Sequence, residues 1–411
     1  MGLKSGMGGL GAVVRDRNAG AYLGTVVMSA FGTGAMILAA GVWVMSLTDN
    51  AGLAALVQVV MWLPTLAAPF VGTVVDRIGR HRAVLIWTML ITGALLTSLL
   101  LVNSACRLWL LFAVMFGYGL SYLFTEAAEA ALLPSAVPTD LLGHVNSLRM
   151  AAQESSKLTA PLVGAGLFAA FGGGAVALLD AATFLAAALL CLLVRPVNRP
   201  IGPRAGSRVR DGLAYLRNSP LLRRLVLVAS ISMGLAGLSG SLTFALIDDG
   251  LGYAPAFAGV LTAAQGAGTV LYALGSGGLL RRVGPARLAA LGVAMFALGA
   301  LLRATGVVWL VIAGTALVGA GLPGPLIAYS TVLQSDTPPG LVARVASTAS
   351  LISLAPSVLG QLLGVVLATA VDYRIPLAAV GVLALGLAAR VMSAESPTRR
   401  RAMAPDGRPG S

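Results

Sequence analysis

The sequence predicts an all-α membrane protein with twelve transmembrane helices in two pseudo-symmetric six-helix halves. Hydrophobic residues make up 57% of the 411 residues and charged residues only 10%, and the mean hydropathy is +0.89. A soluble protein of this composition would expose a largely apolar surface. Cutting the chain into stretches of about 20 residues, the length that crosses roughly 30 Å of hydrocarbon, gives twelve candidate spans.

The twelve spans fall into two sets of six because the chain repeats itself: the segment from Gly277 to Gly284 mirrors the segment from Gly72 to Gly79. The predicted parts are a cytoplasmic N-terminal tail (1–20), a first half (21–194), a cytoplasmic linker (195–220), a second half (221–393) and a basic cytoplasmic tail (394–411). The spans begin near Tyr22, Ala51, Ala83, Leu108, His144, Gly173, Leu222, Pro255, Ala286, Val307, Val342 and Ile375.

Positive charge is distributed unevenly between the two sides of these spans. With the N-terminus in the cytoplasm, the inner segments hold 23 of the 28 Lys and Arg residues, and the outer segments hold Arg107, Arg303 and Arg374. Cytoplasmic segments of membrane proteins carry the excess of positive charge. Both termini of a multi-pass protein of the cell membrane, plasma or inner, are therefore predicted to be cytoplasmic. This distribution leaves no basic face for a nucleic-acid partner, despite a pI of about 10.8.

The residues give no support to an enzyme or a cofactor protein. Cys106 and Cys191 fall at opposite ends of their spans, so no disulfide or metal framework is predicted. The sequence contains neither a phosphate-binding Gly-x-x-x-x-Gly-Lys-Ser/Thr loop nor a set of nucleophile, base and metal ligands. We expect no catalytic residue, cofactor or metal, and a monomer whose partners are a small-molecule substrate, protons and the lipid bilayer.

Charged residues inside spans are the functional candidates, because each costs roughly 2.5 to 3.5 kcal/mol at the centre of an inserted helix. In span five, Arg149, Gln153, Glu154 and Lys157 form a single polar arc. Glu154 and Lys157, three residues apart, can pair. Counting about 1.5 Å per residue from His144 places these two residues roughly 15 to 20 Å deep, near the middle of the bilayer.

Span four carries a matching arc that includes Tyr118, Tyr122, Glu126 and Glu129. Glu126 has no cation in register on its own helix, and it is the preferred proton carrier. The alternative is structural: Glu154 with Lys157 and Glu129 with Arg149 would then be ion pairs. The predicted candidates for proton coupling are Glu126, Glu154, Glu129 and Asp180. For Asp180, which lies in span six, a structural hydrogen-bonding role is favoured.

The second half is neutral where the first is acidic, since Ala328 and Leu354 stand at the positions that match Glu126 and Glu154. Hydroxyl and amide groups with a few aromatic rings suit a large, mostly apolar solute. Ser and Thr also pack helices closely, which is the alternative for the hydroxyl groups. The predicted substrate cavity is lined by Trp62, Tyr118, Tyr122, Gln153, Gln265, Tyr272, Ser353 and Gln361.

The loop between spans two and three is the densest run of charge between two apolar stretches. It reads Gly-x-x-x-Asp-Arg-x-Gly-Arg, with Gly72, Asp76, Arg77, Gly79 and Arg80. Gly72 permits a close helix contact and Gly79 a tight turn, while Asp76 can lie against a helix end. This motif resembles the loop signature of the major facilitator superfamily of secondary transporters. The resemblance implies the major facilitator fold and a switch between two transport states.

A narrower resemblance is to the macrolide-efflux and siderophore-exporter branch of that superfamily. It is carried by Asn146 to Gly166, the segment around Asp180, and Asp211 to Arg217. Pro161 and Gly164 resemble a reduced form of the span-five motif of proton-coupled drug exporters. Two positions depart from the branch: Ala113 replaces an arginine, and no acid occurs around Gly32 to Gly34.

The resemblance implies efflux of an amphiphilic natural product, drug or siderophore-like molecule by an antiporter of the multidrug-resistance type. The alternatives are an importer or uniporter of a small solute, and a facilitator-like membrane sensor or partner that transports nothing.

Overall fold

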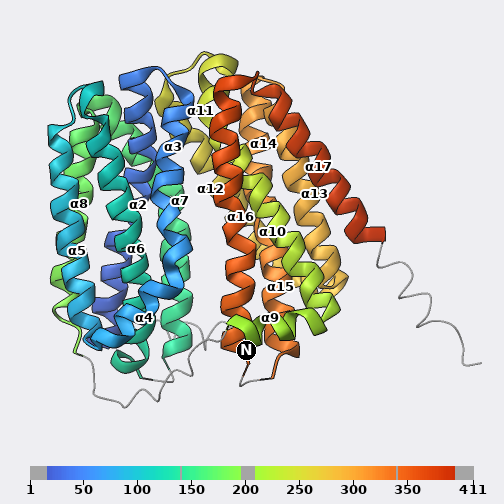
Figure 1. The fold of residues 1–411 in the computed structure, drawn as a ribbon, viewed down its shortest axis with the longest axis horizontal. Helices are drawn as coiled ribbons and strands as arrows, with labels where there is room; N and C mark the ends of the chain where they lie inside the picture. The colour runs from blue at the N-terminus through green and yellow to red at the C-terminus, as the bar shows by residue number, and fades with distance from the viewer. Residues whose placement is uncertain (1–15, 139–140, 196–208, 339–340, 394–411) are drawn as a thin grey trace, which may run out of the picture. The chain divides into compact units, whose positions relative to one another are not determined.

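The computed structural model describes residues 16–138, 141–195, 209–338 and 341–393, and the elements in these ranges are helices (Figure 1). In the first part of the chain they are α2 (Arg17–Thr48), α3 (Ala51–Trp62), η1 (Leu63–Ala67), α4 (Ala68–Ile78), α5 (His81–Ser98), η2 (Leu99–Leu101), η3 (Ala105–Arg107), α6 (Leu108–Ala136), α7 (Leu142–Phe171) and α8 (Gly173–Cys191).

After the linker come α9 (Val209–Asn218), α10 (Pro220–Ser241), α11 (Thr243–Ala245), η4 (Leu246–Leu251), η5 (Pro255–Phe257), α12 (Ala258–Val283), α13 (Pro285–Arg303), α14 (Val308–Gly321), α15 (Pro323–Asp336), α16 (Val342–Ala370) and α17 (Arg374–Ser393).

The described helices confirm an all-helical membrane fold. Ten of them are long and apolar enough to cross a membrane, and the bent pair of α3 and α4 would make an eleventh. The remaining predicted span is α7, which is 30 residues long but carries the charged arc expected from the sequence. The predicted spans therefore correspond to helices of sufficient length.

Span two is broken, and its prolines give the reason. Pro64 lies in the first turn of η1, and Pro69 lies in the first turn of α4. Proline lacks the backbone N–H and clashes with the preceding turn, so two prolines five residues apart interrupt a continuous helix. The two parts bend by 62°, and α4 ends in a left-handed Gly79 with a φ of 66°.

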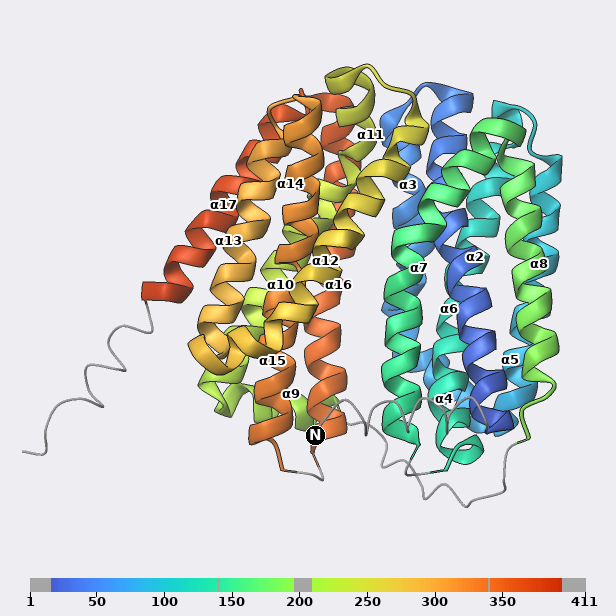
Figure 2. The ribbon, with the colours of Figure 1, turned by 180° about the vertical axis from the view of Figure 1, so that it is seen from behind.

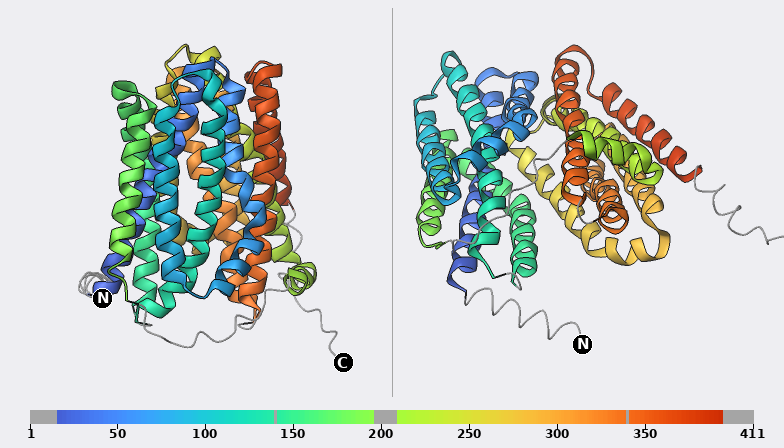
Figure 3. Two further views of the ribbon diagram at one scale, coloured as in Figure 1. Left: turned by 60° about the vertical axis from the view of Figure 1, so that its left-hand side comes forward. Right: turned by 60° about the horizontal axis from the view of Figure 1, so that its bottom comes forward.

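The chain divides into two compact units. The first contains the described residues of Met1–Gly206, together with Gly240–Gly266 and Gln361–Val371. In this unit α2 packs against α7 and α8, and α5 packs against α6 and α8 (Figures 1 and 2). Figure 3 shows α5, α6 and α8 side by side from another direction. The described helices of the first half thus lie in one unit, together with the stretches 240–266 and 361–371.

The second unit contains the described residues of Ser207–Ser239, Ala267–Gly360 and Asp372–Ser411. Its centre is α13, which packs against α14, α15 and α17. The short helix α9 belongs to this unit, where the Tyr215 hydroxyl donates a hydrogen bond to the backbone oxygen of Asp336 at the end of α15 (2.8 Å) and Leu216 is buried.

Two pairs of glycines allow α13 and α14 to approach at backbone distance. A Cβ added to Gly292 would lie 2.7 Å from the Gly321 oxygen, and one added to Gly314 would lie 2.7 Å from the Gly299 oxygen. The two glycines of α13, Gly292 and Gly299, are seven residues apart, which is about two helical turns, and so are the two glycines of α14, Gly314 and Gly321. The antiparallel helices therefore meet at two points on one face, as small residues permit in membranes.

Candidate functional site

The charged residues predicted in spans four and five form one cluster in the first unit. The Arg149 Nη2 atom of α7 donates to Glu126 Oε1 of α6 at 2.8 Å, and Arg149 Nε lies 3.4 Å from Glu129 Oε2. The Tyr22 hydroxyl of α2 donates to Glu129 Oε2 at 3.2 Å. Three helices are thereby joined by polar contacts, and we call these four residues the Arg149 cluster.

Burial differs sharply within the Arg149 cluster. The Glu129 side chain is 4% exposed, whereas Glu126 is 38% and Arg149 is 22% exposed. Two carboxylates share one guanidinium, so the cluster has a net charge of −1 when both acids are ionised and is neutral when one acid binds a proton. The two protonation states of the cluster therefore differ by one unit of net charge, with the guanidinium in contact with both acids in either state.

The contact of Glu129 with Arg149, which the sequence offered as the structural alternative, is present, and Glu126 is also paired with Arg149. The cation reaches Glu126 from a neighbouring helix, which inspection of α6 alone could not reveal. Tyr22 was missed, because a tyrosine near the start of an apolar span has no distinguishing spacing. The Glu154 side chain lies outside the described residues, so its pairing with Lys157, which is exposed, remains a prediction.

A second acidic site surrounds Asp180 of α8. Its side chain is fully buried, and the Tyr118 hydroxyl lies 2.8 Å from Asp180 Oδ2 and 2.8 Å from Thr33 Oγ1 of α2. The Thr183 hydroxyl lies 2.7 Å from the Asp180 backbone oxygen and 3.2 Å from Asp180 Oδ1. Asp180 thus lies within hydrogen-bonding distance of two hydroxyl groups, and whether its role is structural stays a prediction.

The residues predicted to line a substrate cavity differ in accessibility. Trp62 and Tyr122 pack edge to face with ring centres 5.5 Å apart, and Trp62 Nε1 donates to Gln58 Oε1 at 3.1 Å. The half-buried residues of the predicted set are Trp62, Tyr122, Gln153, Gln265 and Gln361, and the buried ones are Tyr118, Tyr272 and Ser353. The half-buried members are better placed than the buried ones to contact a solute.

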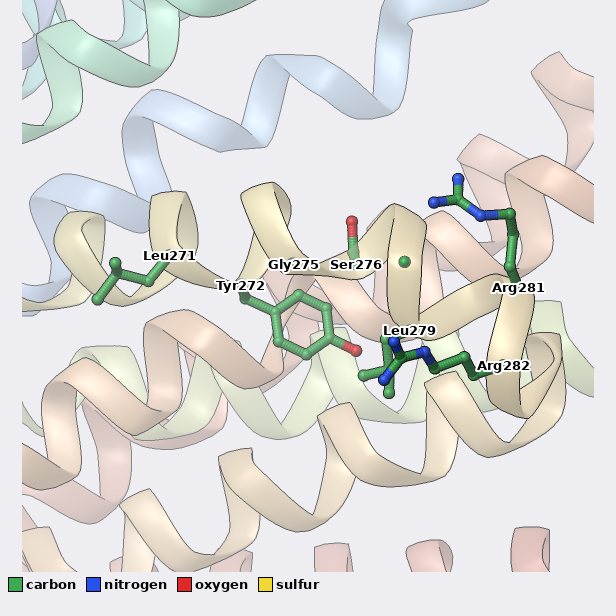
Figure 4. A pocket seen from close by; sticks show the side chains of 8 residues that line it. Leu271, Tyr272, Gly275, Ser276, Leu279, Arg281 and Arg282 are labelled. Carbon is green, nitrogen blue, oxygen red and sulfur yellow. The ribbon is translucent and has the colours of Figure 1, made fainter.

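In the second unit, a cavity of about 690 Å³ lies along the last turns of α12 (Figure 4). The Tyr272 hydroxyl donates to the Leu288 oxygen (3.2 Å), and the Ser276 hydroxyl donates to the Ala273 oxygen (2.8 Å). Both hydroxyl groups therefore donate to the backbone and not into the cavity. The charged groups that line the cavity are Arg281 and Arg282.

The predicted loop motif spans the end of α4. Asp76, Arg77, Gly79 and Arg80 are exposed, and a Cβ added to Gly72 would meet no atom within 4 Å. Gly164 of the span-five motif is different, because an added Cβ would lie 2.6 Å from the Ala35 oxygen of α2. Pro161 lies inside α7, one turn earlier. The span-five motif is thus a point of close contact between α7 and α2.

Comparison with known families and structures agrees with this architecture. The model of the Major Facilitator Superfamily matches residues 22–247, more than half of the chain. The chain belongs to the Major Facilitator Superfamily. It is a multi-pass membrane protein of a transporter family and not an enzyme.

One similar protein is the uncharacterized MFS-type transporter YfiS of Bacillus subtilis (strain 168), which is 28% identical over 219 residues. That match covers 51% of this chain and 52% of YfiS, so the chain matches about half the length of this relative.

Solved structures show the same fold at low sequence identity. The POT family transporter PepTSo has a TM-score of 0.76 and 13% identity, with coverage of 94% of this chain and 99% of its own. The nucleoside transporter NupG has a TM-score of 0.67 and 14% identity, with coverage of 90% and 98%. A bacterial homologue of the iron transporter ferroportin, in an inward-facing state, has a TM-score of 0.66 and 17% identity, with coverage of 92% and 99%.

Proposed function

We propose that this chain is a secondary active transporter that exports an amphiphilic small molecule by proton antiport. The observation that carries the proposal is the Arg149 cluster, in which one buried and one half-exposed carboxylate share a single guanidinium. Such a cluster can exchange one proton at low electrostatic cost. Export and the macrolide or siderophore type of solute come from the resemblance of the sequence, and the coupling residues come from the cluster.

Proton binding would weaken the contact that the cluster makes between α6 and α7. A proton on Glu129 or Glu126 removes one of the two attractions to Arg149, and so weakens one contact between α6 and α7. A transporter alternates between two states, and a ligand shifts that equilibrium by the difference in its affinity for them. The Gly72 to Arg80 loop, with its exposed Asp76, would contribute to the same switch as a contact made in one state.

The solute class follows from the half-buried side chains of the first unit. Trp62 and Tyr122 offer two perpendicular rings, and Gln153 offers an amide that can both donate and accept. Rings with few polar groups favour an amphiphilic solute over a strongly charged one.

The experiment is accumulation of a panel of labelled amphiphiles in cells with and without the gene, under an imposed proton gradient. Export predicts lower accumulation with the gene and loss of the difference when an uncoupler collapses the gradient. Glu126→Gln and Glu129→Gln should reduce the dependence on the gradient while downhill exchange continues. Asp248→Asn, at an exposed acid, is the matched control.

Other outcomes would reject the proposal. Higher accumulation with the gene indicates an importer or uniporter, and a difference that survives the uncoupler excludes proton drive. No change for any solute, with normal amounts of protein in the membrane, favours a sensor or partner that transports nothing.

A further inference from the structure

Among the acids whose side chains the structure describes, Asp180 is the most deeply buried one outside the Arg149 cluster. Its neighbours are supplied by three helices: Tyr118 of α6, Thr33 of α2, and Thr183 one turn further along α8. The position is fitted to the carboxyl group, because a Cβ added to Gly32 of α2 would overlap Asp180 Oδ1 and Thr183 Oγ1. A glycine on α2 therefore makes the room that the carboxyl group occupies.

No cation faces Asp180 among the residues that the structure describes. The elements packed against α8 are α2, α5, α7 and η2, and α6 contacts α8 through Tyr118. η2 has no charged residue, and the charged residues of α6 are the acids Glu126 and Glu129. On α2 the charged residue is Arg17 at its start, far from Thr33. On α5, Arg82 donates to the backbone oxygens of Cys191 and Leu192 at the C-terminal end of α8, about three turns beyond Asp180. On α7, Arg149 binds Glu126, and Lys157 is exposed. The titratable group that touches the carboxyl is the Tyr118 hydroxyl.

The hydroxyl hydrogens around Asp180 are too few for a carboxylate. Tyr118 has one hydrogen, and its oxygen lies 2.8 Å from both Asp180 Oδ2 and Thr33 Oγ1, so it donates fully to only one of them. Thr183 also has one hydrogen, and its closer acceptor is the Asp180 backbone oxygen. A buried carboxylate needs several donors or a cation. Here Thr183 has a closer acceptor, and the Tyr118 hydrogen can serve the carboxylate only when Thr33 donates to the Tyr118 oxygen instead of accepting from it.

We propose that Asp180 is a proton-binding site, separate from the Arg149 cluster, that holds the neutral acid at neutral pH. In this form Asp180 donates to the Tyr118 oxygen and Tyr118 donates to Thr33, so that each hydrogen has one acceptor. Loss of the proton to water reverses the direction: Thr33 donates to Tyr118, and Tyr118 donates to the carboxylate. A role in transport would rest on the proposed proton antiport, but proton binding itself does not.

Infrared spectroscopy of the purified protein in lipid at pH 7 tests the site without a substrate, through the carbonyl stretch of a protonated carboxylic acid. We expect this band in the wild type. In Asp180→Asn the band should lose the intensity of one carboxyl group. In Tyr118→Phe the band should shift to higher frequency, because a hydroxyl partner of the carboxyl group is removed. Asp248→Asn, which changes an exposed acid, should leave the band unchanged.

An identical acid band in the wild type and Asp180→Asn would overturn the proposal, because it means that Asp180 is ionised. If Asp180→Asn does not fold, Tyr118→Phe decides: a band that does not move overturns the proposal, and a shifted band supports it. Failure of proton-driven efflux with the Asp180 band present rejects the proposed function alone. Normal proton-driven efflux with no Asp180 band rejects this inference alone.

Discussion

Arg149 shows how much one side chain can determine in a membrane helix bundle. It is the cation that both Glu126 and Glu129 approach, and Glu129 is 4% exposed. Removing one partner of a buried ion pair leaves an uncompensated charge, which costs more than the pair contributes. The Arg149 cluster is therefore sensitive to the loss of its cation and tolerant of the simultaneous loss of a cation and an acid.

Arg149→Met should lower the free energy of unfolding by about 3 kcal/mol or more, because Glu129 is then buried with only the Tyr22 hydroxyl as a partner. The measurement is the thermal unfolding midpoint of the purified protein. Adding Glu129→Gln to Arg149→Met should restore part of the loss. Arg217→Met, at an exposed position, is the control and should change stability by no more than about 0.5 kcal/mol. Equal midpoints for Arg149→Met and this control would contradict the prediction.

At the scale of helices, the close packing of α13 and α14 in the second unit depends on glycines at the contact. The pairs Gly292 with Gly321 and Gly299 with Gly314 bring the backbones of α13 and α14 together, whereas a Cβ added to Gly386 of α17 would meet nothing within 4 Å. Glycine lowers helix stability by about 1 kcal/mol relative to alanine, so its presence at a contact must be compensated by packing.

Gly314→Ala and Gly386→Ala should therefore have opposite effects. The added methyl group at Gly314 must displace backbone of α13, which typically costs about 1 to 3 kcal/mol. The same change at Gly386 should raise stability by up to about 1 kcal/mol through helix propensity alone. Thermal unfolding of the two variants in one detergent gives the comparison, and a shift in the same direction for both would show that propensity, not the α13–α14 contact, decides.

For the whole molecule, the distribution of positive charge predicts that both termini and the linker are cytoplasmic. The linker and C-terminal residues concerned, around Arg204 and Arg401, lie outside the described residues. Reporter fusions after each of these two arginines measure the side directly. A reporter active outside the cell at either position would refute the predicted orientation, and a fusion after Arg107, expected outside, calibrates the opposite signal.

The sequence predicted those features of the fold that have a single physical cause, such as the apolar length needed to cross the bilayer. Apolar length predicted the spans, and the matching polar arcs of α6 and α7 offered the contact of Glu129 with Arg149 as the structural alternative to proton coupling. The partners Tyr22, Thr33 and Thr183 could not be predicted, because hydroxyl groups on apolar helices serve packing as often as hydrogen bonding. The break in span two follows from Pro64 and Pro69, and the spacing of these prolines was the available signal.

The polarity of α7 also has a consequence for how the chain is made. Arg149, Glu154 and Lys157 all lie within this helix, and a charged residue adds roughly 2.5 to 3.5 kcal/mol to the cost of insertion when it lies at the centre of an inserted helix. The residues that compensate Arg149 are on α2 and α6, which are synthesised earlier. When α7 leaves the ribosome, its partners are therefore already available. We expect α7 to enter the bilayer together with α6 and not alone, so that the order of helices in the chain is itself a requirement for its assembly.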